Sequence, residues 1–178
     1  MAKTSRRLET EYAEITVESQ KCKKLESENK VGNYYIVPSE NRSLFTGYIN
    51  GPENSLYSGG KFNFKLEILA DFPFKAPRFT FTTPIYHINI NDKGLVCIDI
   101  LKNNWSPAFT LNKLLISIRS LFEDPNPKDP LVSEIANLFV SDKKQYEKNI
   151  KEHVKKYAME KKNKKTLTTQ TPKDSGET

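Results

Sequence analysis

One cysteine and one histidine lie close together in the stretch YHININDKGLVCIDIL, residues 86–101. They are Cys97 and His87, and the chain has only two residues of each type. Asn89 lies between them, and Asp99 follows the cysteine. A thiol, an imidazole, an amide and a carboxylate in one short stretch could bind a metal ion or support nucleophilic catalysis. Cys97 could also be a small apolar residue of the core.

The surrounding residues separate these three possibilities only in part. A structural zinc site usually needs four ligands with close cysteine or histidine pairs, and Cys22 and His153 are far away in the sequence. The pattern therefore predicts no metal site. A hydrolase would need the imidazole to accept the thiol proton, but no local hydrolase signature surrounds Cys97. The neighbours Val96 and Ile98 favour a buried cysteine, whereas the long loop and its carboxylates favour a functional one.

The segments before this stretch are expected to form a helix and an antiparallel sheet. Residues 5–16 place apolar side chains at helical spacing, and residues 18–33 read as a helix end followed by a long exposed connection. Four segments typical of strands then follow with short turns between them, at residues 33–38, 43–49, 61–69 and 78–83. Consecutive strands with short connections predict an antiparallel meander.

The segments after the sheet are expected to be a loop and then helices. Residues 84–109 lack a regular period, and a long ordered loop inside a compact domain is often functional. Thr110 is a candidate N-cap of a central helix, and two C-terminal helices are predicted at 132–139 and 141–157. The central helix has a wide apolar stripe, formed by Leu111, Leu114, Leu115, Ile118, Leu121 and Phe122. Strands and helices in separate blocks predict an α+β fold.

Length, hydropathy, cysteine content and net charge limit the number of domains, the cellular compartment and the kinds of partner. A chain of 178 residues fits one domain, which we place at residues 1–160, with a basic and polar tail at 161–178 that we expect to be disordered. The chain contains neither a long apolar run nor an apolar stretch after its first basic residues, so we expect no membrane span and no secretory signal. Two cysteines make no disulfide framework, which favours the cytoplasm, with the nucleus as an alternative. The net charge of +6 fits a solvated helix face better than a nucleic-acid surface, because no nucleic-acid-binding signature is present.

Four motifs together resemble the ubiquitin-conjugating enzyme family. They are GYINGPENSLYSGGKF, FPFKAPRFTFTTPIYH, GLVCIDIL and WSPAFTLNKLLISIRSLFEDPNPKDPL, in the family's order and close to its spacing. The resemblance covers roughly residues 3–158. It implies a four-stranded antiparallel sheet with an N-terminal helix, a central helix and two C-terminal helices.

The resemblance also implies a reaction and a set of partners. An activating enzyme would deliver ubiquitin as a thioester to Cys97, and a substrate lysine, usually selected by a ligase, would then attack it. The implied partners are ubiquitin, an activating enzyme, ligases and protein substrates, with no nucleic acid and no membrane, and the chain is expected to be a monomer. No cofactor is expected on this chain, because ATP and Mg²⁺ are used upstream by the activating enzyme.

Each matched residue of the reactive loop receives a role from the resemblance. Cys97 is the nucleophile, and Asn89 is either a donor to the oxyanion or a brace of the loop that holds it; loop capping alone is the simpler alternative. Asp99 and Asp129 would position the substrate ammonium and accept its proton, although each could instead form a local hydrogen bond or cap. His87 is expected to brace the loop rather than to act as a base.

Further matches and one departure concern the surroundings of the cysteine. Phe74, Pro107 and Ala108 match loops that contact ligases, although Phe74 could simply pack in a turn. On the other face of the central helix, Lys113, Ile116 and Ser120 are candidates for contact with bound ubiquitin. The family has proline at the position of Ile88, so we expect a looser active-site loop and slower or more partner-dependent transfer.

Two alternative functions stay open at this point. The chain could carry another modifier of the SUMO or NEDD8 type, although SUMO carriers usually have extra residues before the tryptophan that matches Trp105. It could also be a non-catalytic binding relative, but such variants lack the cysteine. The sequence leaves the modifier, the ligases, the chain linkage and the substrates undetermined.

Overall fold

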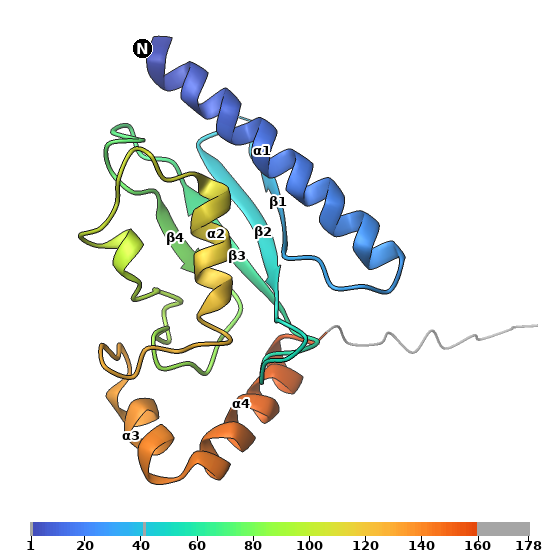
Figure 1. Cartoon of the computed structure of the whole chain (residues 1–178), viewed down its shortest axis with the longest axis vertical. Coiled ribbons are helices and arrows are strands. Elements are labelled where there is room, and N and C mark those ends of the chain that lie inside the picture. Colours follow the sequence, from blue (N-terminus) through green and yellow to red (C-terminus); the bar gives the residue numbers. More distant parts are fainter. Residues whose placement is uncertain (1, 41, 160–178) are drawn as a thin grey trace, which may run out of the picture.

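The computed structural model describes residues 2–40 and 42–159, and its elements follow the predicted order (Figure 1). The strands are β1 Tyr34–Pro38, β2 Leu44–Asn50, β3 Lys61–Glu67 and β4 Arg78–Phe81. The helices are α1 Ala2–Ser27, the short 3-10 helix η1 Asp99–Leu101, α2 Leu111–Ser120, α3 Ser133–Ser141 and α4 Lys143–Tyr157. The predicted tail at 161–178 lies outside the described residues.

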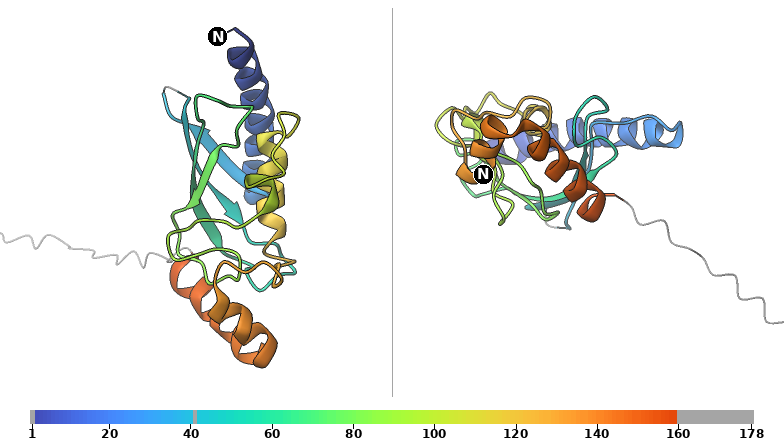
Figure 2. Two further views of the ribbon diagram at one scale, coloured as in Figure 1. Left: turned by 90° about the vertical axis from the view of Figure 1, so that its left-hand side faces the viewer. Right: turned by 90° about the horizontal axis from the view of Figure 1, so that it is seen from below.

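The four strands form one antiparallel sheet in the order β1-β2-β3-β4, which confirms the predicted meander. In β3 the side chains of Phe62, Phe64 and Leu66 are buried, while Asn63 and Lys65 between them are exposed. This alternation gives the sheet one apolar face. Helices α1 and α2 lie over the same side of the sheet (Figure 2), so its apolar face packs against them.

Helix α2 begins where the sequence predicted. The Thr110 hydroxyl accepts a hydrogen bond from the Lys113 backbone N–H at 3.2 Å and so caps the first turn. All six residues of the predicted apolar stripe are buried, in the helix or directly after it. The α+β fold with an N-terminal helix, a central helix and two C-terminal helices is therefore confirmed.

The expectation for residues 18–33 was wrong over most of its length. Helix α1 continues to Ser27, so the connection to β1 is short. The positions that α1 buries after Ile15 are Ser19 and Cys22, at helical spacing. The Ser19 hydroxyl bonds to both the N–H and the carbonyl of Ile36, each at 3.1 Å. Because small polar residues occupy this buried face, no hydrophobic period was visible in the sequence.

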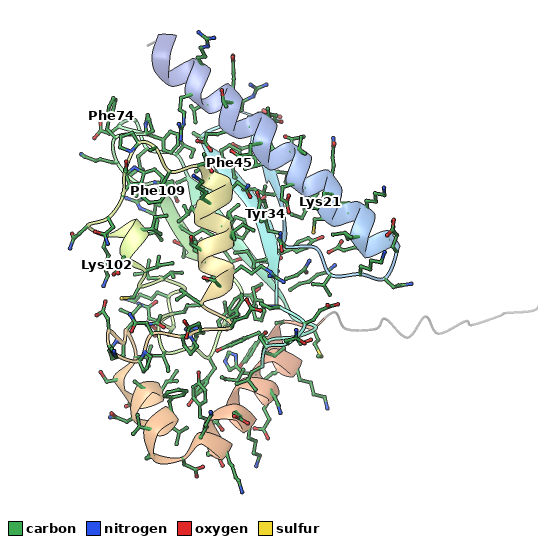
Figure 3. All side chains as sticks on the ribbon, in the orientation of Figure 1. Lys21, Tyr34, Phe45, Phe74, Lys102 and Phe109 are labelled. Carbon is green, nitrogen blue, oxygen red and sulfur yellow. The ribbon has the colours of Figure 1, made fainter. Side chains whose placement is uncertain are left out.

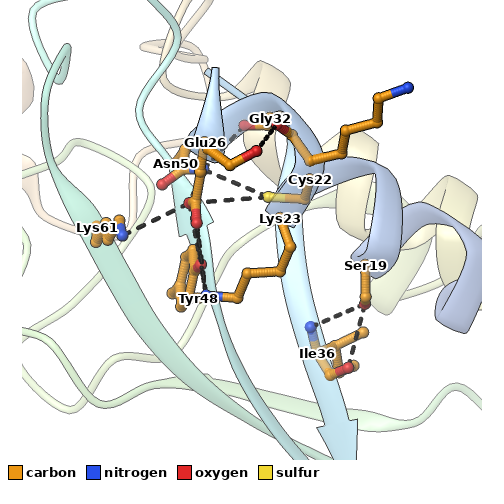
Figure 4. A network of polar contacts seen from close by, with 11 residues as sticks. Ser19, Cys22, Lys23, Glu26, Gly32, Ile36, Tyr48, Asn50 and Lys61 are labelled. Atoms are coloured by element: carbon orange, nitrogen blue, oxygen red, sulfur yellow. Dashed lines mark hydrogen bonds and ion pairs between the residues drawn. The ribbon is translucent and has the colours of Figure 1, made fainter. Parts of the chain in front are cut away.

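A group of polar residues fixes the last turn of α1 to the sheet, and we call it the Glu26 cluster: Cys22, Glu26, Tyr48, Asn50 and Lys61 (Figure 4). The Glu26 carboxylate accepts hydrogen bonds from the Tyr48 hydroxyl at 2.9 Å and from the Asn50 amide at 3.2 Å. The Lys61 ammonium lies 3.5 Å from the same carboxylate. The cluster thus joins α1, β2 and β3.

Helices α3 and α4 extend beyond one end of the sheet (Figure 1). The end of α4 returns to β3, where the Lys61 N–H donates to the carbonyl of Ala158 at 2.9 Å. Tyr146, Ile150 and Val154 form the buried face of α4. Among the described residues, no helix combines the length and the apolar character that a membrane span requires.

Candidate active site

A tight hairpin in the loop after β4 places Cys97 beside Asn89. The Asn91 side-chain oxygen accepts hydrogen bonds from the N–H groups of Lys93 and Leu95, at 3.0 and 2.9 Å. The chain reverses there, and the Cys97 N–H donates to the Asn89 carbonyl at 2.8 Å. Local side-chain bonding by asparagine, which is common in turns, therefore positions the cysteine.

The same hairpin is docked onto β4 through Gly94. This residue has a φ of +76°, and a Cβ atom there would lie 1.9 Å from the carbonyl oxygen of Phe81. The Phe81 N–H donates to the Gly94 carbonyl at 2.9 Å. Only glycine permits both the backbone conformation and this close approach, so the DKGL turn fixes the hairpin against the sheet.

Asn89 is completely buried and joins the hairpin to the segment before α3. Its side-chain amide donates to the carbonyls of Asn126 and Asp129, at 2.8 and 3.0 Å. Its side-chain oxygen accepts from the Asn126 N–H at 2.8 Å. Both amide hydrogens are therefore engaged, which favours the bracing role over the role of direct donor to an oxyanion.

His87 is also completely buried and holds the hairpin from the other side. Its Nδ1 accepts a hydrogen bond from the Asn89 N–H at 2.9 Å, so Nε2 carries the proton and donates to the Leu121 carbonyl at 2.8 Å. Burial lowers the pKa of His87 to about 4, although the bond to Leu121 opposes this shift. The imidazole is thus neutral at pH 7 with both nitrogens occupied, an arrangement suited to a structural role.

Ile88 contributes packing at the position where the resemblance led us to expect proline. Its side chain is completely buried, and its carbonyl accepts hydrogen bonds from Leu131 and Val132, at 2.9 and 3.0 Å. These contacts restrain the backbone in a different way from a proline ring, which fixes φ covalently. The expected slowing of transfer remains a prediction.

A carboxylate and an ammonium lie next to the thiol. The Cys97 sulfur, in a residue that is 8% exposed, is 3.4 Å from Oδ2 of Asp129. The same oxygen accepts a hydrogen bond from the Lys102 ammonium at 2.9 Å. Hydrogen bonds from Lys102 and Cys97 hold the pKa of Asp129 below its ordinary value. Asp99 is exposed at the start of η1.

The match with known proteins agrees with this geometry. The family described as ubiquitin-conjugating enzyme matches residues 7–154. The chain belongs to the ubiquitin-conjugating enzyme family. One similar protein is a probable ubiquitin-conjugating enzyme E2 31 of Arabidopsis thaliana, 47% identical over 120 residues that cover 67% of this chain and 78% of the relative. Membership in this family supports a transferase activity in protein ubiquitination.

The predicted contact residues of this member of the family lie on exposed surfaces. Phe74 is 77% exposed and, like Pro107 and Ala108, lies in a loop (Figure 3 labels Phe74). The Trp105 indole N–H donates to the Pro73 carbonyl at 2.7 Å, which joins the two loops. The second predicted set lies on the exposed face of α2, at Lys113, Ile116 and Ser120.

Two residues of the site were missed in the sequence. Asn126 provides two of the three hydrogen-bond partners of the Asn89 side chain, and Lys102 binds the carboxylate beside Cys97. The motif NPKDPL hinted at Asn126, because a conspicuous turn segment there precedes Asp129. Nothing in the sequence distinguished Lys102 from the other lysines. Across the described residues, no group of three or more His, Cys, Asp or Glu side chains could hold a metal ion.

Proposed function

We propose that this chain accepts ubiquitin as a thioester on Cys97 and passes it to the amine of a substrate lysine. The observation that carries the proposal is the setting of Cys97. Its thiol lies at the rim of a buried and hydrogen-bonded loop, with an exposed carboxylate 3.4 Å away. A fixed thiol beside an accessible anionic group suits a carrier that must admit an amine.

The first step is a thiol exchange. The Cys97 thiolate attacks the carbonyl carbon of the thioester that joins the ubiquitin C-terminus to the activating enzyme. A new C–S bond forms, the old C–S bond breaks, and the cysteine of the activating enzyme leaves as the thiolate. One thioester replaces another, so the step is nearly balanced in free energy, and the chain needs no ATP or metal of its own for it.

The second step is attack by a lysine amine. The amine must first lose a proton, and its nitrogen then adds to the thioester carbon to give an oxyanion. The C–S bond breaks, Cys97 leaves as the thiolate, and the nitrogen loses its second proton to water or to that thiolate, so that a neutral amide remains. An anionic Asp129 would orient the incoming ammonium, and Asp129, Asp99 or water would accept its proton. Partial desolvation in the site would help by lowering the pKa of the substrate amine.

Asn89 acts in this proposal as a positioning residue. Its three side-chain hydrogen bonds hold the segment of Asp129 against the hairpin of Cys97. His87 orients Asn89 by accepting a hydrogen bond from the Asn89 backbone N–H at Nδ1. Neither side chain needs to exchange a proton during the reaction.

The ligase and ubiquitin surfaces are part of the same proposal. An exposed phenylalanine such as Phe74 provides a compact apolar anchor suited to transient binding, and Pro107 and Ala108 extend it. The face of α2 with Lys113, Ile116 and Ser120 would support the bound ubiquitin during transfer. The monomeric state and the cytoplasmic or nuclear location stay predictions.

A charging assay tests the proposal. The protein is incubated with ubiquitin, a ubiquitin-activating enzyme, ATP and Mg²⁺, and is run on gels with and without reducing agent. We expect a ubiquitin adduct that reduction removes and that Cys97→Ala does not form. Cys97→Ser provides a second control, because an oxygen ester at that position would resist thiol reagents.

The same assay also tests the two alternative functions, a carrier of another modifier and a non-catalytic binding protein. If ubiquitin forms no adduct with a folded protein, the ubiquitin assignment is wrong. The same assay with SUMO or NEDD8 and the matching activating enzymes then tests the second alternative. Failure with every modifier would leave the non-catalytic binding function.

A further inference from the structure

The ammonium group of Lys102 binds the Asp129 carboxylate beside Cys97. Lys102 follows η1, and its Nζ lies 2.9 Å from Oδ2 of Asp129. The same oxygen lies 3.4 Å from the Cys97 sulfur. One oxygen atom therefore contacts both the thiol and the ammonium of Lys102.

This is the arrangement that a substrate lysine would need to adopt. A substrate amine must reach the carbon attached to the Cys97 sulfur, and the anionic group next to that sulfur is Asp129. Lys102 presents the same functional group, a primary ammonium, to the same carboxylate oxygen. The two ammonium groups would compete for one site.

The protonation state of Lys102 favours binding to Asp129 over nucleophilic attack on the thioester. Its contacts with Cys97 and Asp129 raise the pKa of the Lys102 ammonium above its ordinary value. An ammonium has no free electron pair and is not a nucleophile. Lys102 bound in this way can exclude a substrate amine, but it cannot accept ubiquitin until it leaves Asp129 and loses a proton.

We propose that Lys102 is an internal competitor of the substrate lysine, which must displace it from Asp129 before transfer. The inference rests on the proposed thioester chemistry of Cys97. The side chains of Lys102 and Asp129 are 44% and 55% exposed, so the pair opens readily. Lys102 thereby raises the concentration of substrate amine at which transfer is half-maximal.

The expected size of the effect follows from typical exposed ion pairs. In such pairs the paired state is favoured over the separated state by about 1.4- to 5-fold. If Lys102 competes with this strength, the apparent KM of the substrate amine is multiplied by one plus the ratio of paired to separated Lys102. Removing the ammonium should therefore lower the KM by about two- to sixfold.

A discharge assay with free lysine as acceptor measures this effect. The protein is first charged with ubiquitin, charging is stopped by removal of ATP, and a series of lysine concentrations is added. Loss of the thioester is followed on non-reducing gels and expressed per charged molecule. We compare the wild type with Lys102→Met, which removes the ammonium, and Lys102→Arg, which keeps a cation but provides no primary amine.

We expect a lower KM for free lysine in Lys102→Met and a value close to the wild type in Lys102→Arg. Lys128→Met is a matched control, because it removes the same charge from the residue next to Asp129. It should change the KM less than Lys102→Met does. In an Asp129→Asn background the effect of Lys102→Met should disappear.

Two results would overturn the inference. One is an unchanged or higher KM in Lys102→Met. The other is a ubiquitin adduct on Lys102 of the wild type that resists reduction and is located by peptide mass spectrometry, because Lys102 would then be an acceptor. If no thioester forms at the start, the proposed function itself has failed, and this outcome is visible before lysine is added.

Discussion

Two regions of this molecule use the same residue types for different purposes. The Glu26 cluster combines a cysteine, a carboxylate, an asparagine and a lysine, and the site around Cys97 combines the same four types: Cys97, Asp129, Asn89 and Lys102. Residue type alone therefore does not distinguish the Glu26 cluster from the proposed reactive site. The exposure of the charged side chains does: those of Asp129 and Lys102 are 55% and 44% exposed, and those of Glu26 and Lys61 are 20% and 32% exposed.

In the Glu26 cluster the thiol is enclosed. Cys22 is completely buried, and a Cβ atom on the neighbouring Gly32 would lie 2.6 Å from its sulfur. Burial, followed by the nearby Glu26 carboxylate, raises the pKa of the Cys22 thiol to about 11. Burial would also raise the pKa of Glu26, but hydrogen bonds from Tyr48 and Asn50 and nearby ammonium groups hold it below its ordinary value.

At the Cys97 site only the supporting half is buried. Asn89 and His87 are completely enclosed and fully bonded, while Asp129 and Lys102 are exposed. A rigid support next to accessible charged groups suits a site that must hold its nucleophile and admit a large partner. The Glu26 cluster lacks this division between buried supporting residues and exposed charged residues.

The largest contrast should appear in thiol reactivity. Iodoacetamide reacts with thiolates, and a thiol of pKa about 11 is only on the order of 10⁻³ ionised at pH 8. We expect native protein to be alkylated at Cys97 at least about a hundredfold faster than at Cys22, as measured by peptide mass spectrometry. Cys97→Ala should take up label only after denaturation. Equal labelling of the two cysteines in folded protein would contradict the comparison.

The next contrast concerns the two asparagines. Asn89→Asp would place a carboxylate oxygen against the carbonyls of Asn126 and Asp129 in place of a donor. We expect discharge to lysine, per charged molecule, to fall by roughly 10- to 100-fold, somewhat less than loss of a direct oxyanion donor would cause.

Asn50→Asp is the matched control for this substitution. It introduces the same change opposite Glu26 and the Gly32 carbonyl, so the melting temperature should fall. Discharge per charged molecule should stay within about twofold of the wild type, because the Asn50 side chain bonds to Cys22, Glu26 and Gly32 and shares no partner with Asn89. A comparable loss of discharge in both variants would mean that stability alone controls the reaction.

A smaller contrast should appear in the pH dependence of stability. The folded state lowers the pKa of His87 from an ordinary value of 6.5 to about 4, so the unfolded chain binds the proton first as the pH falls. The stability that neutral His87 provides is present above pH 6.5 and is lost as the pH falls toward about 4. We expect the free energy of unfolding, measured in urea, to decrease across this range.

His87→Gln should make that decrease shallower, with His153, whose pKa is also lowered by burial, contributing the remainder. Glu26→Gln is the control in the other region. The pKa of Glu26 lies below 4.5 in the folded state, so its contribution is lost only at lower pH. A pH profile that Glu26→Gln alters between pH 6.5 and 5 but His87→Gln does not would reverse this assignment.

Regular periodicity explains which parts of the fold could be predicted. The strands and α2 alternate or repeat large apolar residues, so their positions were evident from residues such as Phe62, Phe64 and Leu114. The second half of α1 was missed because Ser19 and Cys22, which it buries, do not differ in type from residues of an exposed loop.

The site could be predicted only where a motif carried it. Cys97, Asn89, Asp99 and Asp129 came from the family resemblance, and their roles remain proposals. The partners of Asn89 depend on how the segment around Asn126 folds back over the hairpin, and no local pattern records such a contact. The ion pair of Lys102 with Asp129 likewise depends on where two separate loops meet.

The hydrogen bonds of Asn89 to Asn126 and Asp129 also have a consequence for synthesis of the chain. The ribosome synthesises Cys97 before Asp129, so a growing chain contains the thiol before it contains the segment that completes the site. Contacts between residues distant in sequence form late in folding, once the intervening chain is available. Transfer competence should therefore arise only with the nearly finished polypeptide, and a truncated product that ends before Asn126 would expose a cysteine without its carboxylate.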